Sequence, residues 1–287
     1  MGAVVLRTAQ GRVEVLDGGN HDGPVLLVVH GMPGDYRQGV TLLEDLGDVA
    51  RVLLVSRPGY GRTPLSSGRS PQQQADLWAA LLDALGIEQA VVVGISGGGP
   101  SAYSFAAQHP SRCGGLVLVC AVAAHVLPVP VAMRRLAAVP GVWPALASVA
   151  RLWARVRPPV VRTDFTPAEL LALEECRPAL ERFTLDTPTW LSGTGLRNDT
   201  RQLHAITTAQ RGVTAPTLVL HGSADDVVPL ASAQAYAELV PGATLEVLEG
   251  LGHAVPLFAR SLVAQRIRAM LSSAPDRPRP GTASAPA

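Results

Sequence analysis

The chain has 287 residues, enough for one large domain or two small ones and for a sizeable buried core. Hydrophobic residues make up 47% of it and charged residues 16%, a composition that excludes an intrinsically disordered protein. The 24 basic residues nearly balance the 23 acidic ones, giving a formal net charge of +1, and this balance argues against a nucleic-acid-binding protein.

Cysteine usage and apolar runs bear on the cellular compartment. Cys113, Cys120 and Cys176 have neither the number nor the spacing of a disulfide framework or a zinc site. The N-terminal sequence lacks the basic segment and long apolar stretch of a secretory signal, and no apolar run reaches the length of about 18 residues that a membrane span needs. These observations predict a soluble, cytoplasmic protein.

Strand and helix patterns alternate through the first part of the chain. A short antiparallel pair is predicted at Val4–Leu6 and Val13–Val15. Continuous apolar runs, typical of strands buried on both faces, follow at Val25–Val29, Val52–Val55, Ala90–Val93 and Leu116–Val119. Helices are predicted at Pro71–Leu85, which Gly86 ends, and at Pro100–Gln108. The alternation predicts an α/β fold, a doubly wound and mostly parallel sheet with helices on both faces.

The alternation stops near residue 125 and resumes with strands predicted at Thr217–Leu220 and Thr244–Leu248. Between them, helix-like pieces separated by prolines lie at Val131–Ala138, Pro144–Val156 and Pro167–Leu173. We predict that residues 1–125 and 212–272 form two parts of one core and that 126–211 form an inserted helical unit. Residues 273–287, rich in Pro, Ser and Ala, are predicted to be a disordered tail.

The strongest chemical signal is Ser96, within Gly94–Gly98 between a predicted strand and a predicted helix. In this setting a G-x-S-x-G segment forms a sharp turn that exposes the serine hydroxyl above the sheet. Glycines two residues to either side leave room for the crossing strand and helix, and the nearby helix N-terminus favours a developing negative charge. We therefore predict that Ser96 is a nucleophile.

A serine hydroxyl needs a base that removes its proton and a carboxylate that orients the base. His253 follows the strand at 244–248, at the carboxyl end where open α/β sheets place their sites. The loop after the strand at 217–220 offers Asp225 and Asp226, and either can serve as the acid. The order serine, acid, histidine along the chain supports a catalytic role for His253.

The segment His30–Gly34 ends the first buried strand. Its backbone can bring the Met32 N–H close to a carbonyl oxygen under attack. Together with the Gly97 N–H, this predicts an oxyanion hole with two donors.

These segments resemble the α/β-hydrolase fold superfamily over about residues 1–272. The resemblance rests on HGMPG, the loop Arg57–Thr63, GISGG and the paired GSADDVVP and GLGH segments. It implies that Asp225 rather than Asp226 is the acid, because members commonly carry it three residues after the glycine of the second HG pair. It also implies that residues 126–211 are the helical cap that covers the pocket and sets substrate choice.

A few residues distinguish this chain from particular families of the superfamily. Epoxide hydrolases and haloalkane dehalogenases use an aspartate nucleophile, which Ser96 argues against. Proline iminopeptidases usually have glycine in place of Met32 and a bulky residue in place of Gly97. Their cap acids bind a substrate ammonium group, whereas we interpret Glu174 and Glu175 as surface residues. Perhydrolases and carbon–carbon bond hydrolases share the same triad and are alternatives.

The predicted cap is apolar and rich in tryptophan. Trp143, Trp153 and Trp190 are candidate substrate-binding residues, as is His125 at the end of a sheet strand. Packing of the cap onto the core accounts for the tryptophans equally well.

The sequence thus predicts a serine hydrolase that cleaves a small ester, thioester or lactone through an acyl-enzyme on Ser96, with His253 and Asp225. We expect no metal and no organic cofactor, a small-molecule acyl substrate, no nucleic acid and no membrane span. A lyase, cyclase or perhydrolase that uses the same pocket, and a ligand-binding receptor with residual hydrolase activity, are the alternatives. The sequence specifies neither the substrate nor the oligomeric state.

Overall fold

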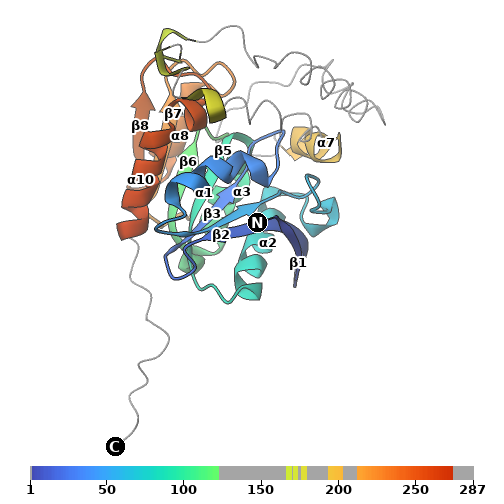
Figure 1. Ribbon diagram of the computed structural model, residues 1–287. Coiled ribbons are helices and arrows are strands. Elements are labelled where there is room, and N and C mark those ends of the chain that lie inside the picture. Colours follow the sequence, from blue (N-terminus) through green and yellow to red (C-terminus); the bar gives the residue numbers. More distant parts are fainter. Residues whose placement is uncertain are drawn as a thin grey trace, which may run out of the picture.

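The computed structural model describes residues 2–122, 166–169, 171–173, 176–179, 193–202 and 212–273. These residues contain an eight-stranded sheet with helices on both faces (Figure 1). The strands are β1 (Val4–Thr8), β2 (Gly11–Gly19), β3 (Val25–Val29), β4 (Arg51–Val55), β5 (Ala90–Ile95), β6 (Cys113–Val119), β7 (Thr217–Gly222) and β8 (Thr244–Leu248). The helices are α1 (Val40–Leu46), α2 (Pro71–Ala84), α3 (Gly99–Gln108), α7 (Gly193–Gln202), α8 (Leu230–Leu239), α9 (Val255–Phe258) and α10 (Arg260–Ser273).

The sheet is mixed but mostly parallel. Its strands lie in the order β1-β2-β4-β3-β5-β6-β7-β8. The pairs β1–β2 and β2–β4 are antiparallel, and every pair from β4 to β8 is parallel. The predicted fold class is therefore confirmed, as is the antiparallel opening. The observed β3 and β8 coincide with the predicted strands, and the other strands of the parallel part differ by at most a few residues at their ends.

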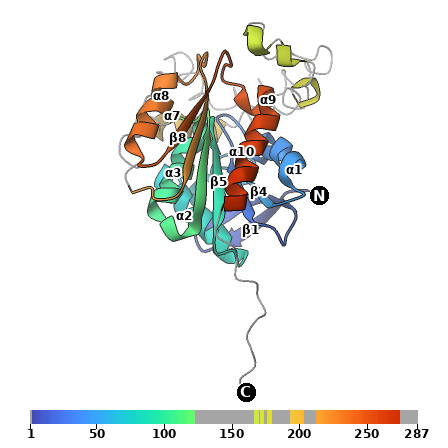
Figure 2. The same cartoon turned by 90° about the vertical axis from the view of Figure 1, so that its left-hand side faces the viewer.

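Side chains of the central strands enter two separate hydrophobic cores. In β3, Leu27 packs into the core shared with α2, α3 and α8, whereas Leu26 and Val28 pack into the core shared with α1 and α10. Figure 2 shows α2, α3 and α8 on one side of the sheet and α1 and α10 on the opposite side. Because both faces are covered, the strand is apolar at every position.

Local sequence determines where α2 begins and ends. The Ser70 side chain accepts the Gln73 N–H, and the Gln73 side chain accepts the Ser70 N–H, so that two otherwise unpaired N–H groups at the start of the helix are satisfied. Gly86 has φ of 63°, a left-handed conformation that stops the helix where the sequence predicted.

Part of the predicted insertion is described. Between β6 and β7, residues 167–169, 171–173 and 176–179 are helical, and α7 follows them. The helical pieces predicted at 131–138 and 144–156 lie outside the described residues, as do 274–287; α10 includes Ser273, the first residue of the predicted tail. None of the described helices is long and apolar enough to cross a membrane.

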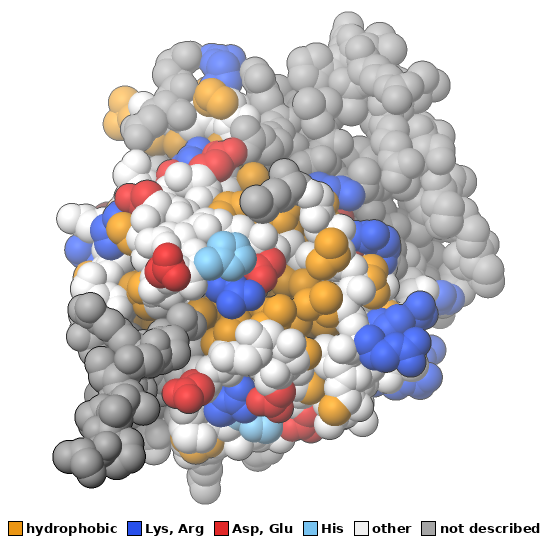
Figure 3. All heavy atoms as spheres, turned by 60° about the horizontal axis from the view of Figure 1, so that its bottom comes forward, with side chains coloured by type: hydrophobic (Ala, Val, Ile, Leu, Met, Phe, Trp, Pro, Cys, Tyr) orange, Lys and Arg blue, Asp and Glu red, His pale blue; other side chains and the backbone are white. Residues whose placement is uncertain are grey.

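Surface charges of opposite sign lie close together. On the face shown in Figure 3, acidic and arginine side chains lie beside one another around hydrophobic ones. Ion pairs such as Arg112–Asp83 and Arg266–Glu246, each with an N–O distance of 2.7 Å, are examples of this arrangement. Opposite charges are therefore paired locally as well as balanced in number.

Leu53→Ala is expected to lower the free energy of unfolding by about 2–5 kcal/mol, because Leu53 is 0% exposed in β4 and its truncation leaves a cavity. Leu239, 48% exposed at the end of α8, is the matched control, and its replacement by alanine should change stability by about 0.5 kcal/mol or less. Urea unfolding followed by circular dichroism measures both. Equal losses for the two variants would contradict the burial of Leu53 in the core.

Candidate active site

Ser96 lies on the turn between β5 and α3. Its φ is 47°, in the left-handed region that L-residues rarely adopt. A methyl group added to Gly94 would lie 2.7 Å from Ala102 Cβ, and one added to Gly98 would lie 2.4 Å from Val29 O. Only glycine therefore fits two residues before and two residues after the serine, as the sequence predicted for a turn of this kind.

The structure brings Ser96, His253 and Asp225 together. His253 Nε2 lies 3.0 Å from Ser96 Oγ, and His253 Nδ1 lies 2.8 Å from Asp225 Oδ2. With its proton on Nδ1, the imidazole donates to the carboxylate and can accept the serine proton at Nε2. This is the arrangement of a Ser–His–Asp triad, and the carboxylate that contacts the histidine is Asp225, while Asp226 is exposed.

The Asp225 carboxylate is anchored in its loop. Its Oδ1 accepts the N–H groups of Val227 and Val228 at 2.9 and 2.8 Å. Burial disfavours its charge, but the hydrogen bond and charge of His253, together with the two backbone donors, outweigh burial and lower the pKa of the carboxyl below its usual value. Asp225 is therefore ionised at neutral pH and can stabilise an imidazolium.

His221, at the end of β7, contacts the same loop. Its Nε2 lies 2.8 Å from Val228 O and 3.4 Å from Asp225 Oδ2, and the ring is fully buried. Burial lowers the pKa of His221, so the ring is neutral and its Nε2–H donates to the carbonyl. The histidine thus holds the loop in place without adding a charge beside the carboxylate.

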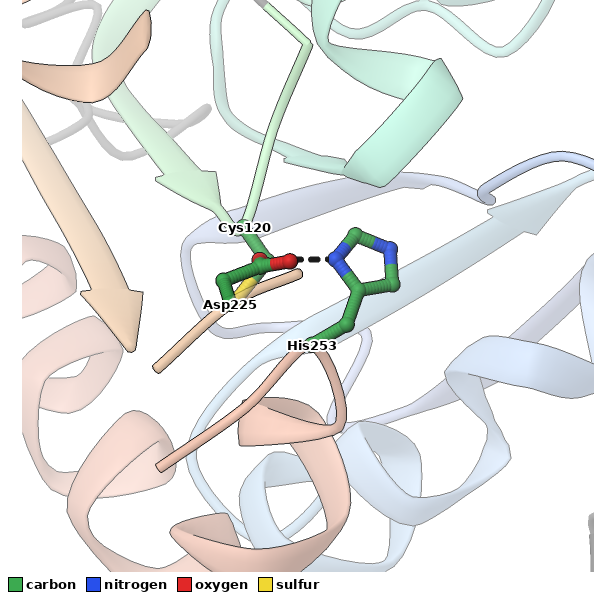
Figure 4. A group of neighbouring side chains, drawn as sticks. All are labelled: Cys120, Asp225 and His253. Atoms are coloured by element: carbon green, nitrogen blue, oxygen red, sulfur yellow. Dashed lines mark hydrogen bonds and ion pairs between the residues drawn. The ribbon is translucent and has the colours of Figure 1, made fainter. Parts of the chain in front are cut away.

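Cys120 is a further neighbour of the pair (Figure 4). It follows β6 with φ of 46°, and its sulfur lies within 4.8 Å of a carboxylate oxygen of Asp225. Burial and then the charge of Asp225 raise the pKa of the thiol, so it stays protonated.

The thiol, the carboxylate and the imidazole of His253 each offer a ligand atom within 4.8 Å of one another, and these are residue types that bind zinc. A cysteine binds zinc as the thiolate, however, whereas the Cys120 thiol is protonated. Both oxygens of Asp225 already accept hydrogen bonds. This donor set therefore suits a hydrogen-bonded triad better than a metal.

The two residues predicted to supply oxyanion donors lie close together beside the serine. A methyl group added to Gly97 would lie 2.7 Å from Met32 Cβ and 3.2 Å from Met32 N, and one added to Gly31 would lie 3.1 Å from Ser96 Cβ. The Met32 N–H donates to no atom of the described residues. A pocket opens on this side; it is lined by Met32, Arg57, Pro71, Gln74, Gly97, Pro100, Ser101, Asp199 and Gln202.

A carboxylate from the predicted insertion contacts the His253 loop. Glu169, which is 3% exposed, accepts the Gly252 N–H at 3.1 Å, and its other oxygen accepts the Thr166 N–H at 3.0 Å. Sequence reasoning missed this residue because its partner lies 83 positions further along the chain. It also missed Cys120 and His221 as neighbours of the acid.

The remaining predicted site residues lie outside the described part of the chain. They are His125, Trp143, Trp153 and Trp190. The glutamates at 174 and 175, interpreted as surface residues, also lie outside it.

The fold and site define an α/β enzyme with a serine, a histidine and an aspartate at the carboxyl edge of its sheet. Residues 24–259 match the model of the alpha/beta hydrolase fold family. The chain therefore belongs to the α/β hydrolase fold family and is an enzyme, a hydrolase of that family.

Individual relatives agree with this assignment. An uncharacterized hydrolase of Bacillus subtilis, YcgS, is 28% identical over 85% of this chain and 92% of its own length. A 2-hydroxymuconate semialdehyde hydrolase of Pseudomonas putida is 30% identical over 68% of this chain and 66% of its own. The solved structure of an alpha/beta hydrolase fold protein from Nakamurella multipartita is 30% identical, with a TM-score of 0.75 over 94% of this chain and 99% of that one.

Cys120 is expected to resist alkylation in the folded protein, because its thiol is buried and its raised pKa leaves little thiolate. Brief exposure to iodoacetamide, followed by digestion and mass spectrometry, measures this. The same treatment in urea, where the thiol is exposed, should modify it fully. Rapid modification of the native protein would contradict the burial of the thiol.

Proposed function

We propose that the protein is a serine hydrolase that cleaves an ester, thioester or lactone bond in a small acyl substrate through an acyl-enzyme. The observation that supports this is the continuous line of hydrogen bonds from Asp225 through His253 to Ser96, with distances of 2.8 and 3.0 Å. A hydroxyl becomes a nucleophile when a base oriented in this way lies within hydrogen-bond reach.

In the first half-reaction, His253 Nε2 takes the proton as Ser96 Oγ attacks the substrate carbonyl carbon. The carbonyl oxygen becomes an oxyanion, which the N–H groups of Met32 and Gly97 stabilise. Preorganised donors of this kind are worth about 100- to 1,000-fold in rate each. The ionised Asp225 stabilises the imidazolium that forms, which then protonates the leaving alcohol or thiol.

In the second half-reaction, His253 takes a proton from water as the water oxygen attacks the acyl carbon. The second tetrahedral intermediate uses the same two donors. Its collapse returns the proton to Ser96 Oγ and releases the carboxylic acid. The sum is one substrate and one water converted to an acid and an alcohol or thiol, or, for a lactone, to a single hydroxy acid, with the enzyme unchanged. No step requires a group beyond these side chains and amides.

Substrate choice is assigned to residues 126–211, which we propose cover the pocket with apolar side chains, among them Trp143, Trp153 and Trp190. Because one relative is named 2-hydroxymuconate semialdehyde hydrolase, a substrate of that kind belongs beside esters and lactones in an activity panel. Turnover of that substrate alone would favour the carbon–carbon bond hydrolase alternative, which uses the same three groups.

A fluorophosphonate is expected to add once to the wild-type protein and not at all to Ser96→Ala, because only an activated serine hydroxyl displaces fluoride from phosphorus. Intact mass after incubation measures the adduct. Ser104→Ala is the control, since Ser104 is a buried serine of α3 outside the site, and it should label like wild type. Absence of the adduct on folded wild-type protein would overturn the proposal.

Asp225→Asn should lower kcat for an ester about 1,000- to 10,000-fold, because an amide cannot stabilise the imidazolium and permits the wrong tautomer of His253. Asp226→Asn, one residue along and exposed, should stay within about threefold of wild type. Steady-state kinetics on the best substrate of the panel compares the two. The reverse order of effects would assign the acid to Asp226.

A further inference from the structure

Arg57 lies beneath the peptide that carries the Met32 N–H. It follows β4 and is 2% exposed. Its Nε donates to the His30 carbonyl at 3.0 Å, and its Nη2 donates to the Gly31 carbonyl at 3.1 Å. A single planar guanidinium therefore holds two consecutive carbonyl groups of the segment that ends β3.

The Gly31 carbonyl and the Met32 N–H belong to the same trans peptide, so they point in opposite directions. The His30 ring contributes a second donor to this carbonyl. Its Nε2 accepts the Arg57 backbone N–H at 2.9 Å, so the proton is on Nδ1, which lies 2.7 Å from Gly31 O. Burial, and then the charge of Arg57, lower the pKa of His30 well below its usual value, which keeps the ring neutral. Two donors on the carbonyl thus determine the direction of the Met32 N–H on the other side.

The guanidinium itself is held from α7. Its Nη2 and Nη1 donate to the two carboxylate oxygens of Asp199 at 2.6 and 3.1 Å, and the Tyr60 hydroxyl donates to the same carboxylate at 2.8 Å. Arg57 and Asp199 are both buried, so each charge depends on the other for compensation. The pair links a helix of the segment between β6 and β7 to the peptide of the oxyanion hole.

We propose that Arg57 and Asp199 are positioning residues for the oxyanion hole. Asp199 fixes the guanidinium, and the guanidinium fixes the Gly31 carbonyl so that the Met32 N–H faces the reacting oxygen. A cation on the carbonyl also polarises the peptide and makes its N–H a stronger donor. The inference rests on the proposed function, since it assigns a task to a donor of that mechanism. The position of α7, which carries Asp199, would then affect the rate of the chemical step.

The test is the double variant Arg57→Met/Asp199→Leu. It removes both charges together and replaces them with apolar side chains, so no buried charge is left unpaired and the fold is retained. We expect kcat for an ester to fall about 10- to 100-fold while KM changes less than about threefold, since the interaction lost is one made in the transition state. Arg57→Lys, which keeps a charge but not the planar fork, should also lose most of kcat. A double variant or an Arg57→Lys variant that keeps the wild-type kcat would overturn the proposal.

The control is Arg266→Met/Glu246→Leu, which removes a bidentate pair on the surface with N–O distances of 2.7 and 2.9 Å. Its kcat should equal that of wild type. A fall matching that of the Arg57/Asp199 double variant would assign the effect to the loss of any ion pair and overturn the proposal.

A second readout does not depend on turnover. The chain has four methionines, so labelling with ¹⁵N-methionine gives a spectrum with few amide signals. The Met32 signal, identified with Met32→Leu, should shift in the Arg57/Asp199 double variant, while that of Met270 in α10 should not. If wild type shows no Ser96-dependent turnover, the proposed function fails, and this shift still tests the positioning role. An unmoved Met32 signal would overturn it.

Discussion

The left-handed backbone of Ser96, with φ of 47°, determines where every other group of the site has to lie. It lets β5 pass into α3 through a single 3₁₀ turn, Ser96–Gly98, so that the serine projects over the carboxyl edge of the sheet. The strands β3, β7 and β8 run parallel to β5 and end at the same edge. The loops that follow them therefore bring Met32, Asp225 and His253 to one place beside Ser96. A strand of opposite direction in this part of the sheet would deliver its loop to the wrong edge.

Buried carboxylates hold this edge together. Asp225 binds two N–H groups of its own loop, Glu169 binds an N–H of the loop that carries His253, and Asp199 binds the guanidinium behind the oxyanion segment. Each charge is compensated by a cation or by backbone donors, as a buried charge has to be. The loops around Ser96 are thus held by fixed hydrogen bonds, which is the preorganisation that the proposed mechanism requires.

Short-range patterns predicted the strands and the Ser96 turn, because apolar runs and glycine spacing are properties of adjacent residues. The choice of His253 also required the order serine, acid, histidine along the chain. The choice of Asp225 over its neighbour required the resemblance to a family, since adjacent carboxylates differ only in the direction of their side chains. Contacts between distant residues that no recognised pair of motifs brings together were not predicted. Arg57 stood within a recognised motif, but its partner Asp199 lies 142 residues away, and no periodicity encodes such a contact. The proximity of Cys120 to Asp225 was missed for the same reason: the two residues follow β6 and β7, which are neighbours in the sheet but far apart in the chain.

The strands β6 and β7 are direct neighbours in the sheet, although the chain makes a long excursion between them. Ser96 precedes this stretch of the chain, whereas Asp225 and His253 follow it. All three residues are therefore carried by the sheet and the loops at its edge. One continuous stretch of chain can accordingly be exchanged for another without moving these three residues. A replacement has to bring two carboxylates of its own, one where Asp199 meets the guanidinium and one where Glu169 meets the histidine loop. Any chimera built on this core therefore has to place a carboxylate at each of these two positions.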